Sequence, residues 1–332
     1  MLLTSVAVSA LLTSCNLPVA SAAPLVTLAD AKAAVIHHWD INRQALRATS
    51  AAEAKRLIEQ VEGGDALKID EATIARDAAA RGSVGNTAPA IPAATGVRVF
   101  VPRQSGYPAV FMSVRAEAQT DAAGAPTGKS VDVLEVFKRV SASAPWLNTG
   151  YAEVAAGLTS KLDITLDRDG YAALADGGPD PASLSTLYSG YISALLASHP
   201  DQASKRIVAG KLSDQFVSDL KKALAQAQGV VQTATFSAST HQEGIALKTG
   251  SGTFVLFDNL YDVTTTPASG GCVSGGQGSA VPGNFSSVTE HFLQNVGAIV
   301  APGADSSVQL IAESDGPTAV DTKPCTSGGA VV

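Results

Sequence analysis

Two kinds of hydrophobic pattern alternate along this chain of 332 residues. Apolar side chains recur at helical spacing behind Thr27-Leu28-Ala29-Asp30, a capping-box pattern that satisfies the free N–H groups of a first helical turn. A second helix is predicted to start at Ser50, and the pair Gly63-Gly64 is expected to end it. An alanine-rich stretch over about residues 70–81 predicts a third helix.

From about residue 97 the period of the apolar positions changes from 3.6 to 2. Valines alternate with other side chains over residues 97–101. Val110, Met112 and Val114 alternate in the same way, and a less regular alternation covers residues 134–140. This pattern indicates antiparallel strands joined by turns rich in proline and glycine.

The same order of elements returns in the second half of the chain. A helical stripe runs from Leu184 to Leu196, and Ser213 is expected to cap a further helix that carries Phe216 and Leu224. Strands are predicted over about residues 230–237, 244–248 and 253–263, with more after Ser286.

A stretch of glycine and proline at residues 176–182 separates the halves and is expected to be a linker. We therefore predict two domains, residues 27–175 and 183–332. Each is expected to be of the α+β class, with helices followed by an antiparallel sheet. Residues 105–111 and 251–257 share Ser, Gly and Phe at matching positions, and together with the repeated order of elements they indicate a tandem duplication.

The N-terminus has the pattern of an export signal. Residues 1–14 carry no charge and are mostly apolar, but they are fewer than the roughly 20 residues that a membrane-spanning helix needs. Leu12-Thr13-Ser14-Cys15 matches a bacterial lipobox, in which the cysteine becomes the new N-terminus and its thiol is lipidated. We expect a lipoprotein on the outer face of the cell membrane. The alternative is cleavage after residues 1–22, before Ala23, which would release a secreted protein.

Both alternatives leave two further cysteines, Cys272 and Cys325. An even pair in an oxidising compartment predicts a disulfide bond. Two thiols at this spacing, without a histidine at ligand spacing nearby, do not predict a metal site.

Several of these features resemble known proteins. The lipobox at Cys15, Val61-Glu62-Gly63-Gly64, Tyr107-Pro108 and the segment 166–172 are similar to exported lipoproteins of unknown function from high-GC Gram-positive bacteria. The repeated pattern resembles the nuclear transport factor 2-like (cystatin-like) cone, in which a long helix packs into a curved sheet and leaves a pocket. This resemblance implies that Trp39 fills or lines such a pocket. It implies no catalytic residue.

Composition restricts the partners. The 23 basic and 30 acidic side chains give a net charge of −7, which is the wrong sign for neutralising phosphates. Aromatic residues make up only 5% of the chain, too few for a base-stacking surface. We therefore expect no nucleic-acid partner.

Three motifs suggest chemistry that their surroundings do not support. Residues 123–130, ending in Lys129-Ser130, fit a phosphate-binding loop, but the next segment is predicted to be a strand where such a loop needs a helix. No nucleotide is expected. Ser218 and Lys221 with Lys248-Thr249-Gly250 resemble the motifs of penicillin-recognising enzymes, but they lie too close together. Residues 167–170 begin like a calcium loop but lack the later ligands, so we predict a turn.

These observations leave three hypotheses for function, and none includes a cofactor or an assigned catalytic residue. The first is a non-catalytic protein that binds a small apolar ligand or a partner in the cell envelope. The second is a hydrolase or isomerase, which a hydrogen bond from His38 or His241 to a buried carboxylate would favour. The third is a structural module, which the absence of any pocket near 300 Å³ would favour.

Overall fold

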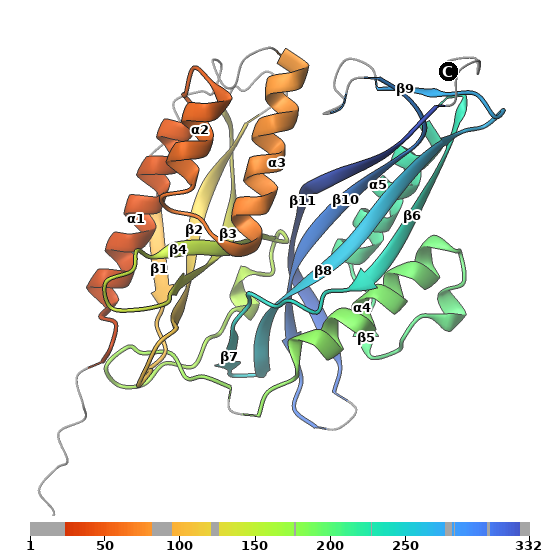
Figure 1. The fold of residues 1–332 in the computed structure, drawn as a ribbon. Helices are drawn as coiled ribbons and strands as arrows, with labels where there is room; N and C mark the ends of the chain where they lie inside the picture. Colours follow the sequence, from red (N-terminus) through yellow and green to blue (C-terminus); the bar gives the residue numbers. More distant parts are fainter. Residues whose placement is uncertain are drawn as a thin grey trace, which may run out of the picture.

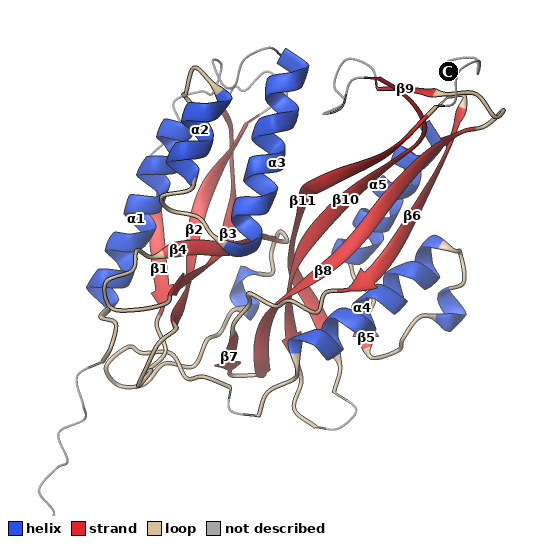
Figure 2. Cartoon of the chain, viewed as in Figure 1, coloured by secondary structure: helices blue, strands red, loops and turns tan. Residues whose placement is uncertain are grey.

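The computed structural model describes residues 24–81, 95–120, 126–175, 177–226, 228–275, 281, 283–303 and 306–325. Five α-helices and eleven strands form a mixed α+β fold in these residues (Figure 2). The first half contains α1 (Leu28–Ala45), α2 (Ala51–Ile58), α3 (Gly64–Arg81), β1 (Thr95–Phe100), β2 (Ala109–Thr120), β3 (Pro126–Arg139), β4 (Leu147–Val154) and a short 3-10 helix (Thr159–Lys161).

The second half begins with α4 (Pro181–Leu196). The first two residues of this helix lie in the segment 176–182 that was predicted to be a linker. It continues with a 3-10 helix (Pro200–Gln202), β5 (Ile207–Val208), α5 (Lys211–Gln226), β6 (Val230–Ala238), β7 (Ala246–Thr249), β8 (Gly252–Pro267), β9 (Val273–Gly275), β10 (Gly283–Val300) and β11 (Val308–Pro324). Asp180 caps α4 by accepting a hydrogen bond from the backbone N–H of Ser183.

All eleven strands belong to one sheet, whose main path runs β1-β2-β3-β4-β11-β10-β8-β6. The two halves join where β4 meets β11, and only two registers pair there, Ala312 with Val154 and Glu313 with Glu153. Helices α1 to α3 lie over the first half, and α4 and α5 pack against the second (Figure 1). The strands are otherwise antiparallel, except that β5 pairs with β11 in parallel.

Local sequence explains most helix boundaries. The side chains of Thr27 and Ser50 accept hydrogen bonds from the backbone N–H of Asp30 and Glu53, as the capping patterns predicted. Gly64 starts α3 with a φ of 56°, so this helix begins six residues before the predicted position. The predicted cap at Ser213 is wrong: α5 begins at Lys211, and the Ser213 hydroxyl donates to the Gly210 carbonyl within its first turn.

The central core is shared between the halves. Met112 and Leu134 of the first half and Phe254 and Leu256 of the second belong to one buried cluster, and each of these side chains is at most 1% exposed. A second cluster lies beneath α4 and α5, and a third lies beneath α1. Burial of this apolar surface against the opposite half therefore stabilises the connection between the two halves.

Candidate functional site: a cleft at the junction of the halves

A cleft of about 530 Å³ lies beside the junction of β4 and β11. Strand β4 and the loop after it contribute Tyr151, Glu153, Ala155 and Ala156, β11 contributes Glu313, Ser314 and Asp315, and α5 contributes residues between Lys211 and Asp219. Ligand sites commonly have volumes of about 300–1,000 Å³, with an apolar lining and a few polar groups. The cleft matches this description in size, and its lining combines an apolar wall with several charged side chains.

Helix α5 forms the apolar wall of the cleft. Its Phe216 packs edge-on against Phe236 of β6 and Tyr261 of β8, with a ring-centroid distance of 6.0 Å in each case. This contact fixes α5 against the sheet, and Leu212 and Phe216 line the cleft from that side. On the sheet side of the cleft, β4 pairs with β11 over two registers only.

Two carboxyl groups of β11 occupy the polar side of the cleft. Glu313 accepts a hydrogen bond of 2.5 Å from the amide of Gln294, and Asp315 accepts one from the Tyr261 hydroxyl. Burial raises the pKa of Glu313 to about 8, and the negative charge of Asp315 acts in the same direction. Burial also raises the pKa of Tyr261. At neutral pH most of the Glu313 carboxyl groups are therefore protonated.

Tyr151 connects the cleft to a buried polar network beneath α3. Its backbone N–H donates to the side-chain carbonyl of Asn295 at 3.1 Å, and its carbonyl accepts from the Ser314 hydroxyl at 2.9 Å. Burial raises the pKa of the Tyr151 hydroxyl, and the charges of Asp70 and Glu62 raise it further. Tyr151 therefore lies between the carboxyl groups of Glu62 and Asp70 on one side and those of β11 on the other.

The network beneath α3 contains one of the histidines considered in the sequence. His38 Nε2 lies 3.1 Å from Glu62 Oε1, and each residue is 4% exposed. Burial raises the pKa of Asp70 to about 8, and the neighbouring Glu62 adds to this shift. The His38–Glu62 pair therefore meets the geometric condition for an acid–base function, which is a histidine within hydrogen-bond distance of a buried carboxyl group. Neither residue lines the cleft or the cavities of about 390 and 660 Å³ in the described part of the chain.

The other histidines lie elsewhere. His241 Nε2 lies 2.7 Å from Glu243 Oε1, but the His241 side chain is 63% exposed. His291 lies between Asp262 and Asp321 on the sheet, at 2.8 and 3.1 Å. His37 is exposed on α1. Within the described ranges, no group of three His, Cys, Asp or Glu side chains is arranged to hold a metal ion.

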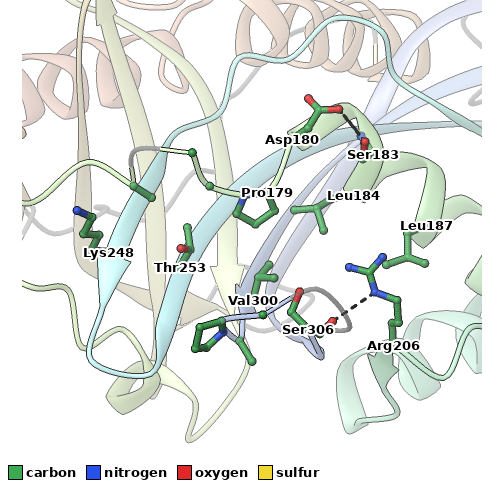
Figure 3. Close-up of a pocket in the computed structure, with 16 residues that line it drawn as sticks. Pro179, Asp180, Ser183, Leu184, Leu187, Arg206, Lys248, Thr253, Val300 and Ser306 are labelled. Atoms are coloured by element: carbon green, nitrogen blue, oxygen red, sulfur yellow. Dashed lines mark hydrogen bonds between the residues drawn. The ribbon is translucent and has the colours of Figure 1, made fainter.

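A second cavity, of about 390 Å³, lies where the predicted linker enters α4. Figure 3 shows Asp180 and Ser183 at the start of the helix, with Arg206 hydrogen-bonded to the Ser306 carbonyl at 3.3 Å on the opposite wall. The helix N-terminus is already occupied by the carboxylate of Asp180, whose pKa is lowered by the Ser183 hydroxyl and backbone. A cavity at a helix N-terminus would normally favour an anion, but here the Asp180 carboxylate already fills that role. This cavity is therefore a weak candidate for an anion-binding site.

The structure also locates the three discounted motifs. Lys129 and Ser130 lie in β3, which pairs antiparallel with β2, so the predicted strand is confirmed. Asp167 accepts hydrogen bonds from the backbone N–H groups of Asp169 and Tyr171, which confirms the predicted turn. Ser218 and Lys221 line a wide third cavity of about 660 Å³, whereas Lys248 lies at the second cavity.

The predicted disulfide is present: Cys272 and Cys325 are bonded, with 6.0 Å between their Cα atoms. Cys15 and the alternative cleavage point before Ala23 lie outside the described residues. No helix in the described segments combines the length and the apolar character needed to cross a membrane.

The sequence predictions missed the residues of the cleft. The run Leu310-Ile311-Ala312-Glu313-Ser314-Asp315 carries a signal that was available, because two acidic side chains directly follow a buried apolar segment. The sequence of this segment does not indicate that it lies beside Tyr151 and α5, because both are far away along the chain.

Fold and cleft together define an α+β protein whose described strands form one continuous, mostly antiparallel sheet, with a ligand-sized cavity where its two halves join. Comparison with protein families matches residues 22–321 to a family described as "Domain of unknown function (DUF8094)". The match covers most of the chain, which therefore belongs to this family. Neither the curated proteins nor the solved structures contain a match to this chain.

Proposed function

We propose that this protein is exported, is anchored by a lipid at Cys15, and binds a small ligand in the cleft between β4, β11 and α5. The cleft is the observation that carries the proposal, because it exceeds the 300 Å³ below which a purely structural role was favoured. Its apolar wall at Leu212 and Phe216 faces polar groups at Glu313 and Tyr151. We infer a ligand with an apolar body and one hydrogen-bonding end.

The disulfide supports the extracytoplasmic part of the proposal. Bonds of this kind persist in oxidising compartments and are rare in the cytosol. The intact mass of the native protein tests the anchor directly. We expect a mature N-terminus at Cys15 with added acyl mass and a two-proton loss for the disulfide. An unmodified N-terminus at Ala23 would show a secreted protein instead.

We further propose that the two halves arose by tandem duplication of a cone-like unit. In each half a strand phenylalanine packs beneath the helices of its own half: Phe111 belongs to the cluster under α1, and Phe257 contacts Tyr188 of α4 at 6.0 Å. These two phenylalanines are the matching positions of the segments 105–111 and 251–257. Binding in a pocket is the role that a cone suggests.

Ligand binding is tested with N-phenyl-1-naphthylamine, an uncharged fluorescent probe with an apolar body and one N–H donor. We expect saturable fluorescence enhancement with one site per chain. Ala156→Phe places a ring at the exposed rim of the cleft and is expected to weaken binding at least tenfold. Leu187→Phe makes the same kind of change at the second cavity and serves as the matched control. Saturable binding that survives Ala156→Phe, or no binding at all, would contradict the proposed site.

The hydrolase or isomerase hypothesis remains the second candidate because of the buried His38–Glu62 pair. Its weakness is that His38 and Glu62 lie outside the linings of the three cavities described above, of about 390, 530 and 660 Å³. A binding function does not depend on this pair, and we therefore prefer it.

A further inference from the structure

The end of the molecule where α1 begins carries arginine side chains stacked on aromatic rings. The Arg103 guanidinium lies 4.4 Å from the ring centre of Tyr171. The Arg139 guanidinium lies 4.7 Å from the centre of Trp146 and 5.6 Å from that of Tyr107. Tyrosine and tryptophan are enriched at membrane interfaces, where the apolar ring and the polar edge each find a suitable environment.

These pairs lie together in space. Arg139 ends β3 and pairs with Ala109, the first residue of β2. Leu28, the first residue of α1, packs against Gly170 in the turn that follows Asp167. Figure 1 shows the start of α1 and the start of β2 at the same end of the first half. We call this end, defined by Arg103, Tyr107, Arg139, Val140, Trp146, Leu166 and Arg168, the N-terminal face.

Exposed apolar side chains occur on the same face. Val140 directly follows Arg139, and its side chain is 68% exposed. No other large apolar residue in the described part of the chain is more exposed. Leu166 is 48% exposed and is held next to the turn by its bridge to Ala172. Apolar side chains beside arginines form the combination that inserts shallowly at a lipid headgroup layer.

The charge of the face differs from that of the whole chain. Arg103 forms ion pairs with Asp167 and Asp169, which neutralise much of its charge. Arg168 lies 3.7 Å from Asp169, but its side chain is 91% exposed and points its charge to solvent. Three arginines against these two aspartates give +1, whereas the chain as a whole carries −7. An anionic surface therefore repels this face less than the net charge of the whole chain implies.

We propose that the N-terminal face docks on the headgroups of an anionic lipid bilayer. This inference rests on the proposed anchor, because only the eight residues 16–23 separate Cys15 from Pro24. A chain of this length spans at most about 30 Å. The tether therefore holds the start of α1 near the membrane and gives the face a high effective concentration at the lipid surface.

Docking orients the whole molecule. Trp146 lies at the depth of the headgroups, and Trp39, which is 6% exposed and stacked under Arg115, stays away from the lipid. The two tryptophans of the chain are therefore natural reporters of orientation.

The experiment couples a chain starting at Cys15 through that thiol to maleimide-lipid vesicles of phosphatidylcholine and phosphatidylglycerol. The vesicles also contain a lipid with a nitroxide at the headgroup level. In Trp39→Phe only Trp146 emits, and in Trp146→Phe only Trp39 emits. We expect strong nitroxide quenching of Trp146 and weak quenching of Trp39. Equal quenching of both would overturn the proposal.

Charge and position are tested with further variants in the Trp39→Phe background. Arg168→Glu is expected to lower the docked population about fivefold or more, since each basic residue near an anionic surface contributes about this factor. Val231→Asp, on β6 at the far edge of the sheet, places a charge on a residue that is 50% exposed and is expected to change nothing. Quenching that is the same on vesicles without phosphatidylglycerol would also contradict the proposal. The chemical tether replaces the natural lipid, so these results are independent of the mass measurement that tests the anchor.

Discussion

The carboxyl group of Glu313 shows how a single side chain acquires its properties from the fold. On β11 it follows Ala312, which is fully buried, and it is surrounded by Gln294 and Asp315. Burial disfavours its charged form, so its pKa of about 8 lies well above the ordinary value for glutamate. Burial likewise raises the pKa of Asp70 to about 8 and that of Asp258 to about 7.

These raised values determine how stability depends on pH. Between the ordinary carboxyl pKa near 4 and a folded value near 8, the folded protein binds more protons than the unfolded chain, so stability falls as pH rises. Glu313→Gln keeps the acceptor for Gln294 and removes the titration. We expect it to raise the free energy of unfolding by about 1–3 kcal/mol at pH 8.5 and to change it little at pH 5.

Urea unfolding at the two pH values measures this difference. Glu59→Gln, at an exposed position that caps the end of α2, serves as the control and is expected to leave the pH profile unchanged. A Glu313→Gln profile parallel to that of the natural chain would show that Glu313 is ionised at neutral pH in the folded protein.

At the scale of elements, the contact of α3 with β11 requires a glycine. A Cβ atom at Gly316 would lie 2.3 Å from the Cγ2 atom of Ile69 on α3. Gly316→Ala is therefore expected to displace the helix from the strand and to destabilise the protein by about 1–3 kcal/mol, the usual range for overpacking. Thermal unfolding measures the loss, and Ile69→Ala in the same chain is expected to recover part of it.

The opposite effect is expected on α4. Gly190 lies on the exposed side of this helix, and a Cβ atom there would meet no atom within 4 Å. Gly190→Ala is the matched control and is expected to stabilise the protein by about 0.5–1 kcal/mol, because alanine loses less backbone freedom than glycine in a helix. Equal effects of the two alanines would contradict the steric account.

Element prediction from sequence succeeded where a local signal sufficed. The caps at Thr27 and Ser50 and the valine alternations of β1 and β2 are local signals, because each is read from a few neighbouring residues. Strand β4 escaped notice because its burial follows no period of two: Asn148, Thr149 and Gly150 are three consecutive buried residues.

At the scale of the whole molecule, the shared core makes the two halves depend on each other. Phe254 of β8 is fully buried in a cluster with Met112 and Leu134 of the first half. Phe254→Ala leaves a cavity in this cluster and is expected to cost about 3–5 kcal/mol. Since the halves share this core, we expect them to unfold in one transition.

The tryptophans provide a direct test, because both of them, Trp39 and Trp146, lie in the first half. Although Phe254 belongs to the second half, Phe254→Ala is expected to lower the urea midpoint seen by tryptophan fluorescence as much as the midpoint seen by circular dichroism. An unchanged fluorescence midpoint would show two independent domains, joined but not coupled.

By itself the sequence determined the α+β class, the helix-then-strand order of both halves and the cysteine pair, because hydrophobic period, capping residues and cysteine count are properties of short segments. Only the tertiary structure decided that the strands form one sheet and that the cleft lies at its junction. The physical reason is sequence separation. Tyr151, Phe216 and Glu313 meet through a two-register pairing and a buried core shared by both halves, and no periodicity along the chain encodes either contact.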